Sequence, residues 1–251
     1  MMKESLAVKK ENFEFSKANG QKIRGLICRP DDDNKKYPCV IFSHGFGGCY
    51  AELKHHGDGY AENGIVCVFF DFCGGGLKST SDGNMSEMTI LTEAEDLDTV
   101  MSGVIALPYV DKDLLYIQGE SQGGMVSTMV AAKRQDEIKA MILWYPAFVI
   151  PDDAAERLRS GKSEIFGQTV SEEYNKAAVS VNPAELESAF KKPVLLIHGD
   201  KDPVVPITYS EEALKRFTDA RLEVIKNAGH GFDGADSIHA RELSIAFIKE
   251  N

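Results

Sequence analysis

A serine, a pair of aspartates and a histidine, widely spaced along the chain, have the types and order needed for nucleophilic catalysis. Ser121 is the centre of GESQG, residues 119–123, which fits the G-x-S-x-G pattern and lies between an apolar run and a helix-like segment. Asp200 and Asp202 follow a later apolar run, and His230 follows the next one. A serine hydroxyl becomes an effective nucleophile when a base takes its proton and an acid orients that base. The sequence therefore predicts a serine nucleophile, a histidine base and an aspartate acid.

The elements that must position these residues alternate along the chain. Apolar runs typical of buried parallel strands are separated by helix-length segments, which predicts an α/β fold with helices on both faces of the sheet. A turn signal at residues 18–20 predicts an N-terminal hairpin. Ser121, Asp202 and His230 each come just after a predicted strand, so we expect them to meet at the carboxyl edge of the sheet. The predicted strands are 39–42, 65–70, 114–117, 140–144, 194–197 and 222–225, and the predicted helices are 50–62, 93–107, 122–133, 209–217 and 237–249.

One segment interrupts this alternation. Residues 151–183 carry many charges and no strong strand before the sheet resumes. We interpret them as an inserted cap over the active site, with residues 1–150 and 184–251 forming the core. The alternative is a long decorated loop, because structureless connections of this length are uncommon but known.

The motifs around the predicted triad resemble those of the α/β-hydrolase superfamily along nearly the whole chain, and the order serine, acid, histidine is also that of this superfamily. The similarity is strongest to small capped bacterial esterases that include the cinnamoyl (feruloyl) esterases. It implies a mostly parallel eight-stranded sheet with a small cap. It also implies that Asp202 is the acid and that Asp200 forms a turn. The motifs are SHGFG at 43–47, DFCGGG at 71–76, GESQGG at 119–124, HGDKD at 198–202 and GHGF at 229–232.

The oxyanion formed during acyl transfer needs two hydrogen-bond donors that are already in place. In a nucleophile elbow one donor is the backbone amide of the residue after the serine, which is Gln122 here. The second comes from the loop after the third strand, and the resemblance of residues 44–46 to the H-G-x loop of the family points to the amide of Phe46.

Cap residues of the cinnamoyl esterases contact an aromatic acyl group and its ring hydroxyl. By this resemblance Asp153 and Tyr174 are candidate partners of such a hydroxyl, and Phe166 is a candidate apolar wall. The alternative is that all three are ordinary surface or packing residues of the cap.

These observations predict a serine carboxylesterase that acts on small or aromatic acyl esters through an acyl-enzyme intermediate. An acyl thioesterase uses the same triad and stays an alternative. A peptidase of the prolyl oligopeptidase type is disfavoured, because such relatives usually carry a large accessory domain for which we expect no room here. A hydrolase-fold binding protein without catalysis normally lacks a triad member, and none is missing.

The amino-acid composition limits the kinds of molecule that the protein is expected to bind. A formal net charge of -11 disfavours nucleic acid and anionic membranes, and leaves a small-molecule ester as the expected partner. The polar start of the chain lacks the apolar core of a secretory signal, so we expect a cytoplasmic protein. Five cysteines without C-x-x-C spacing indicate reduced thiols, and we expect no metal or other cofactor. His55 and His56 are expected to be solvated. The sequence leaves open whether the chain forms a homodimer.

Overall fold

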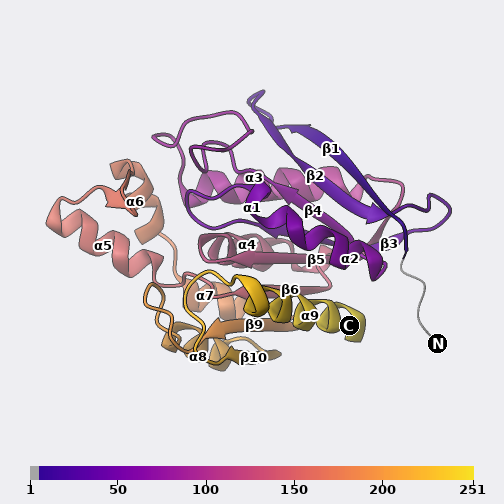
Figure 1. The fold of residues 1–251 in the computed structure, drawn as a ribbon. Coiled ribbons are helices and arrows are strands. Elements are labelled where there is room, and N and C mark those ends of the chain that lie inside the picture. Colours follow the sequence, from indigo (N-terminus) through magenta and orange to yellow (C-terminus); the bar gives the residue numbers. More distant parts are fainter. Residues whose placement is uncertain (1–5) are drawn as a thin grey trace.

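An eight-stranded sheet forms the centre of the computed structural model, which describes residues 6–251 (Figure 1). The strand order is β1-β2-β4-β3-β5-β6-β9-β10, in which β1 and β2 are antiparallel, β2 and β4 are antiparallel, and the remaining neighbours are parallel. The predicted, mostly parallel eight-stranded sheet is therefore confirmed. The strands are β1 (Val8–Ser16), β2 (Lys22–Pro30), β3 (Tyr37–Ser43), β4 (Val66–Phe70), β5 (Val110–Glu120), β6 (Ala140–Trp144), β9 (Val194–Gly199) and β10 (Ala220–Ile225).

Helices pack on both faces of this sheet and form two separate apolar layers. On one face, buried side chains of α3, α4 and α8 pack against residues such as Ile41 and Leu143. On the other face, α1, α2 and α9 cover residues such as Phe42 and Trp144. The alternation of side chains along each strand thus supplies both cores. The helices are α1 (Tyr50–Leu53), α2 (Gly57–Glu62), α3 (Ile90–Ile105), α4 (Gln122–Arg134), α8 (Thr208–Arg216) and α9 (Gly234–Glu250).

The N-terminal hairpin forms as the sequence predicts. Ser16 pairs with Lys22, and the chain turns between them through Gly20, whose φ of 88° suits a residue without a side chain. In contrast, the single helix predicted over residues 50–62 is divided. A 3-10 turn at Lys54–His56 separates α1 from α2, and α2 packs against β2. A side chain at Gly57 would lie 2.4 Å from the Cys28 sulfur, so the start of α2 lies directly against β2.

Residues 150–179 project from one end of the sheet (Figure 1). They contain α5 (Ile150–Ser160), the short hairpin β7 (Glu164–Ile165) and β8 (Gln168–Thr169), and α6 (Glu172–Val179). The chain then returns to the core through α7 (Pro183–Ala189), which packs against α4 and α8. We call residues 150–179 the cap. No helix within residues 6–251 has the length and apolar character that crossing a bilayer requires.

Candidate active site

Ser121, His230 and Asp202 form one hydrogen-bonded chain. His230 Nε2 lies 2.9 Å from Ser121 Oγ, and His230 Nδ1 lies 2.7 Å from Asp202 Oδ2. The carboxylate can only accept, so Nδ1 carries the imidazole hydrogen and Nε2 is free to accept the serine proton. The three residues come from the loops after β5, β9 and β10, at the carboxyl edge of the sheet, where the sequence places them. This arrangement can generate a serine nucleophile.

The backbone at Ser121 has the strained turn of a nucleophile elbow. Its φ of 50° and ψ of -121° lie outside the regions that a non-glycine residue prefers. The turn is held by two hydrogen bonds to the β6 end: the Ser121 amide donates to the Trp144 carbonyl at 3.0 Å, and the Ala147 amide donates to the Ser121 carbonyl at 2.9 Å. A side chain at Gly119 would lie 2.2 Å from the Gly123 carbonyl oxygen. The small residues of the motif are therefore required by close packing of strand against helix.

Asp202 is the acid that the structure brings to the histidine. Its Oδ1 accepts from the backbone amides of Val204 and Val205, at 2.8 and 2.9 Å. Its Oδ2 lies 3.2 Å from Nε2 of the buried His198, in addition to its bond with His230. Burial of Asp202 opposes ionisation, but these donors outweigh it and hold the pKa of the carboxyl below its ordinary value. The carboxyl group of Asp202 is therefore ionised at neutral pH.

Asp200 has a different task. Its Oδ1 accepts a 2.6 Å hydrogen bond from the Asn227 amide, which ties the loop after β9 to the loop after β10. Asn227 has a φ of 64°, so this tight turn precedes the segment that carries His230. Asp200 therefore supports a turn, and the hydrogen bond to the base comes from Asp202.

The loop after β3 and the start of α4 supply the predicted oxyanion donors. Gly45 lies so close to the elbow that a side chain there would come within 3.2 Å of the Ser121 Cβ. Within residues 6–251, neither the Phe46 amide nor the Gln122 amide has a hydrogen-bond acceptor. Both amides therefore stay free to receive a substrate oxygen beside Ser121. Their role in catalysis remains a prediction.

The Gln122 side chain joins this region to the cap. Its Nε2 donates to Glu93 on α3 at 2.7 Å, and its Oε1 accepts from the Tyr174 hydroxyl on α6 at 2.5 Å. Burial raises the pKa of Glu93 well above its usual value. The sequence suggested Tyr174 as a partner for a substrate hydroxyl. Instead, the structure engages this hydroxyl with Gln122, and the side chain is 1% exposed.

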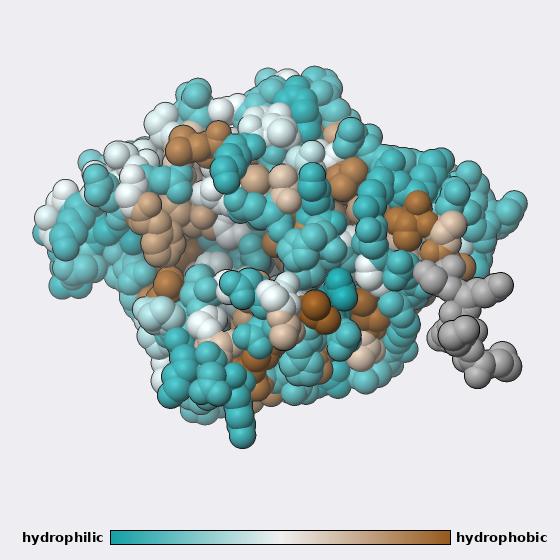
Figure 2. Space-filling model, viewed as in Figure 1, coloured by the Kyte–Doolittle hydropathy of each residue, from teal (hydrophilic) through white to brown (hydrophobic). Residues whose placement is uncertain are grey.

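The other two cap candidates are more accessible. Phe166 occupies the tip of the β7–β8 hairpin and is 67% exposed, with its ring centroid 6.4 Å from that of Phe46. Asp153 lies on the exposed side of the first turn of α5. The surface view shows a recess between the cap and the body of the molecule, with hydrophobic side chains on its cap side (Figure 2). The structure therefore presents an aromatic side chain next to Phe46 in the loop after β3, residues 44–49, which we call the oxyanion loop after its predicted role.

Sequence reasoning missed two residues of the site. Glu120 Oε2 accepts a 2.6 Å hydrogen bond from the hydroxyl of Tyr145, whose ring packs against His230 with 4.8 Å between centroids. The signal for Glu120 was available, because an ionisable residue beside the serine of a G-x-S-x-G motif lies at the end of a buried strand. Tyr145 could not be found from the sequence, since its contact with His230 depends on how β6 and β10 are placed in the sheet.

Other candidate residues have structural surroundings. His44 is buried and accepts at Nε2 from the Phe72 amide at 3.2 Å, so its ring is held by the loop after β4. Cys73 is also buried, and burial raises its pKa to about 12, so its thiol is not an activated nucleophile. The expectation that His56 is solvated was wrong, because it is 2% exposed beside Trp144. No cluster of metal-ligating side chains occurs in the part of the chain that the structure describes.

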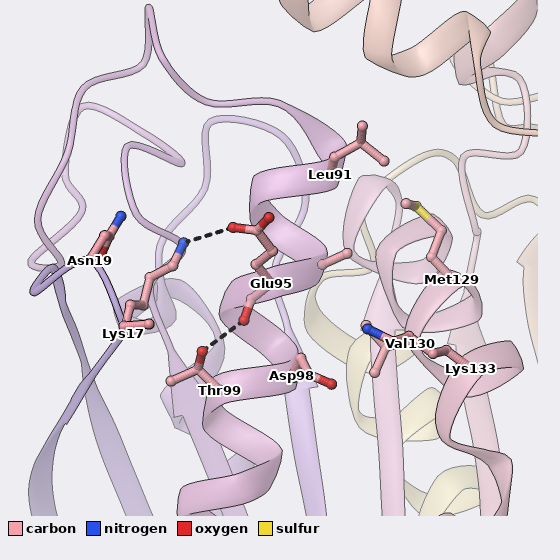
Figure 3. Close-up of a pocket in the computed structure, with 11 residues that line it drawn as sticks. Lys17, Asn19, Leu91, Glu95, Asp98, Thr99, Met129, Val130 and Lys133 are labelled. Atoms are coloured by element: carbon pink, nitrogen blue, oxygen red, sulfur yellow. Dashed lines mark hydrogen bonds and ion pairs between the residues drawn. The ribbon is translucent and has the colours of Figure 1, made fainter.

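A separate groove of about 690 Å³ lies between the tip of the β1–β2 hairpin, α3 and α4 (Figure 3). Its lining includes Met129, Val130 and Lys17, whose ammonium lies 3.7 Å from the Glu95 carboxylate. The triad residues are not among its lining. The groove is therefore distinct from the candidate active site.

The fold and the Ser121–His230–Asp202 chain define a serine hydrolase of the α/β-hydrolase type. Residues 53–251 match the model of the prolyl oligopeptidase family (Peptidase_S9), and the chain belongs to this family. Because of this family match, peptidase activity is also a candidate. From the sequence alone it is disfavoured, because peptidases of this type usually carry a large accessory domain.

Curated and solved relatives include both peptidases and esterases by name. An uncharacterized peptidase, YtmA of Bacillus subtilis (strain 168), is 26% identical over 207 residues, covering 79% of this chain and 77% of YtmA. Dipeptidyl peptidase 8 of Homo sapiens is 30% identical over 152 residues, covering 54% of this chain but 16% of that protein. Est1E from Butyrivibrio proteoclasticus, solved with ferulic acid bound, has a TM-score of 0.79 and 26% identity, with 94% of this chain and 96% of Est1E covered.

Proposed function

We propose that this serine hydrolase is a carboxylesterase for small or aromatic acyl esters, including hydroxycinnamate esters. The observation that carries the proposal is the position of the exposed Phe166, which extends from the cap toward the oxyanion loop and lies near Phe46. Phe46 in turn packs edge-on against Tyr174, with 6.0 Å between centroids. An aromatic acyl group bound at Ser121 would find rings on which to pack. The similarity to Est1E, solved with ferulic acid, supports this substrate class.

The proposed reaction has two steps. Ser121 Oγ attacks the ester carbonyl carbon while its proton passes to His230 Nε2, and the carbonyl oxygen takes the negative charge. The backbone amides of Phe46 and Gln122 would donate hydrogen bonds to that oxygen. Because backbone amides are already fixed in place, no side chain has to become ordered during the reaction. The carbon–oxygen bond to the alcohol then breaks, and His230 returns the proton to the departing alcohol. Water repeats the sequence on the acyl-enzyme and releases the acid.

A substrate panel tests the proposal. The purified protein is assayed with p-nitrophenyl acetate, methyl ferulate, methyl p-coumarate, aliphatic methyl esters of similar size and an acyl-CoA thioester, each beside a Ser121→Ala control. We expect Ser121-dependent hydrolysis of the esters, with kcat/KM higher for the hydroxycinnamates than for other methyl esters of similar size. Preference for the thioester would favour the thioesterase alternative. Loss of the hydroxycinnamate preference in Phe166→Ser, but not in Ile238→Ser on the exposed side of α9, would support the aromatic wall.

A peptidase is the second candidate, favoured by membership in the prolyl oligopeptidase family and by the similarity to YtmA. The same triad can cleave an amide, but the departing amine must be protonated as its bond to carbon breaks. Dipeptidyl p-nitroanilides test this directly. Efficient Ser121-dependent release of nitroaniline, together with weak ester hydrolysis, would replace the esterase proposal.

A further inference from the structure

Glu120, the residue before the nucleophile, places its carboxyl group between two loops of the site. Oε2 accepts the 2.6 Å hydrogen bond from the Tyr145 hydroxyl, and Oε1 accepts a longer one, 3.4 Å, from the Gly45 amide. Gly45 immediately precedes Phe46, so this second bond ties the oxyanion loop to the nucleophile elbow. Burial raises the pKa of this carboxyl, whereas the two hydrogen bonds and the charge of His230 act against that rise and favour the ionised form. Glu120 thus contacts one catalytic loop and lies within the field of another.

Tyr145 connects this carboxyl group to the histidine loop. It is 3% exposed and has a φ of 36°, a backbone conformation that is costly for a bulky residue and often marks a functional site. Its ring packs against both His230 and Phe232, with centroids at 4.8 and 4.6 Å. The Tyr145 hydroxyl donates its hydrogen to Glu120 Oε2.

We propose that Glu120 and Tyr145 form a positioning pair for the catalytic base. Their hydrogen bonds and the packing of the Tyr145 ring hold the oxyanion loop and the histidine loop against the elbow. The Glu120 carboxylate also stabilises the imidazolium that His230 becomes on taking the Ser121 proton. The proposal rests on the proposed function, because it assigns His230 the role of base.

The other ionisable groups near Glu120 and Tyr145 do not cancel the effect of the Glu120 charge on His230. Asp202 bonds to His230 Nδ1 and supplies a second negative charge, and Glu52 on α1 contributes a like charge that disfavours ionisation of Glu120. His44 adds no positive charge, because burial lowers its pKa and its Nε2 accepts from a backbone amide. Loss of the Glu120 charge should therefore remove part, but not all, of the stabilisation of the His230 imidazolium.

The first test measures the pKa of His230 without relying on turnover. The imidazole Cε1–H resonance is followed by NMR against pH in a Ser121→Ala protein, with and without Glu120→Gln. Removal of the carboxylate charge should lower the His230 pKa by about one unit. Tyr145→Phe keeps that charge and should shift the pKa much less. The matched control is Glu187→Gln, which removes a buried carboxylate bonded to Arg216, and it should leave the His230 pKa unchanged.

The second test uses Ser121-intact protein and p-nitrophenyl acetate, an activated ester that requires no aromatic acyl pocket. Glu120→Gln should move the acid limb of kcat/KM to lower pH by the same amount as the NMR shift. Tyr145→Phe should lower kcat about fivefold, since the hydrogen bond that ties the ring packed on His230 to Glu120 is lost. The control is Tyr60→Phe, which removes a buried hydroxyl bonded to Gln118 on the same strand as Glu120 and should change kcat less than about twofold.

Each part of the proposal has an outcome that would overturn it. An unchanged His230 pKa in a folded Glu120→Gln protein would refute the electrostatic role. A kcat for Tyr145→Phe equal to that of Tyr60→Phe would refute the positioning role, and thermal unfolding checks that both proteins are folded. If the unsubstituted protein hydrolyses no ester, the proposed function fails, and the NMR titration still decides whether Glu120 acts on His230.

Discussion

The hydroxyl of Tyr174 in the cap donates to the side-chain oxygen of Gln122, the residue whose backbone amide follows the nucleophile. The two residues are 52 positions apart, and both side chains are buried. This bond joins the cap to the residue whose backbone amide is a predicted oxyanion donor. A cap substitution can therefore change the rate of reaction for every substrate.

Replacement of Tyr174 by phenylalanine tests this connection. The Gln122 oxygen would lose its donor, and we expect kcat to fall about threefold to tenfold, the equivalent of the net ~0.5–1.5 kcal/mol of one hydrogen bond. The loss should be similar for p-nitrophenyl acetate and methyl ferulate. Tyr209→Phe is the control, since it removes a hydroxyl that bonds to the exposed Asp152. A loss confined to methyl ferulate would show that Tyr174 recognises the ring hydroxyl instead.

Ser121→Ala and His230→Ala should each lower kcat by about three orders of magnitude or more, because both residues act in the same proton transfer. The double variant should be hardly slower than either single variant. Steady-state kinetics with p-nitrophenyl acetate checks this, and circular dichroism checks that each protein is folded. Losses that multiply in the double variant would count against a shared step.

Asp202→Asn should lower kcat about a thousandfold or more, whereas Asp200→Asn should stay within about threefold. An amide at Asp202 can present its NH₂ group to His230 Nδ1, which removes the acceptor that fixes the tautomer. An amide at Asp200 keeps the oxygen that accepts from Asn227. Equal effects of the two substitutions on kcat would reverse the choice of acid.

Asp202 should also make stability depend on pH. Its pKa is lower in the folded protein than its ordinary value of about 3.9 in an unfolded chain. The stability it contributes is therefore fully present above that ordinary value and is lost as pH falls toward the folded pKa. Thermal unfolding of the wild type and Asp202→Asn between pH 3 and 7 should show a Tm difference that shrinks below about pH 4. A difference that stays constant down to pH 3 would contradict this linkage.

The sheet and triad could be predicted because their signals are local. Each parallel strand contains an apolar run, and Ser121, Asp202 and His230 each follow one, so parallel topology alone brings them to one edge. The break at Lys54–His56 was missed, and the packing of the following Gly57 against Cys28 is a contact between distant segments that neither segment signals. The short α7 was missed too, although Pro183 at its start and the side-chain cap of Asn182 are recognisable signals.

The support of the site was harder to foresee than the triad. In the sequence, Tyr174 is one of several amphipathic residues of the cap. Its hydrogen bond with Gln122 depends on how α6 packs near the start of α4. Likewise, the hydrogen bond from Tyr145 to Glu120 joins the end of β6 to the end of β5, and the sequence of neither segment predicts this pairing. Sequence motifs identify the residues that react, whereas the residues that hold them in place are determined by tertiary packing.

The separation of 109 residues between Ser121 and His230 has a consequence during protein synthesis. At typical translation rates, roughly 5 to 20 s pass between incorporation of the serine and of the histidine. During that interval the nascent chain holds a serine without its base. The hydroxyl can gain its reactivity only after β10 has joined the sheet beside β9, so the growing polypeptide is protected from premature chemistry by the order in which its strands are made.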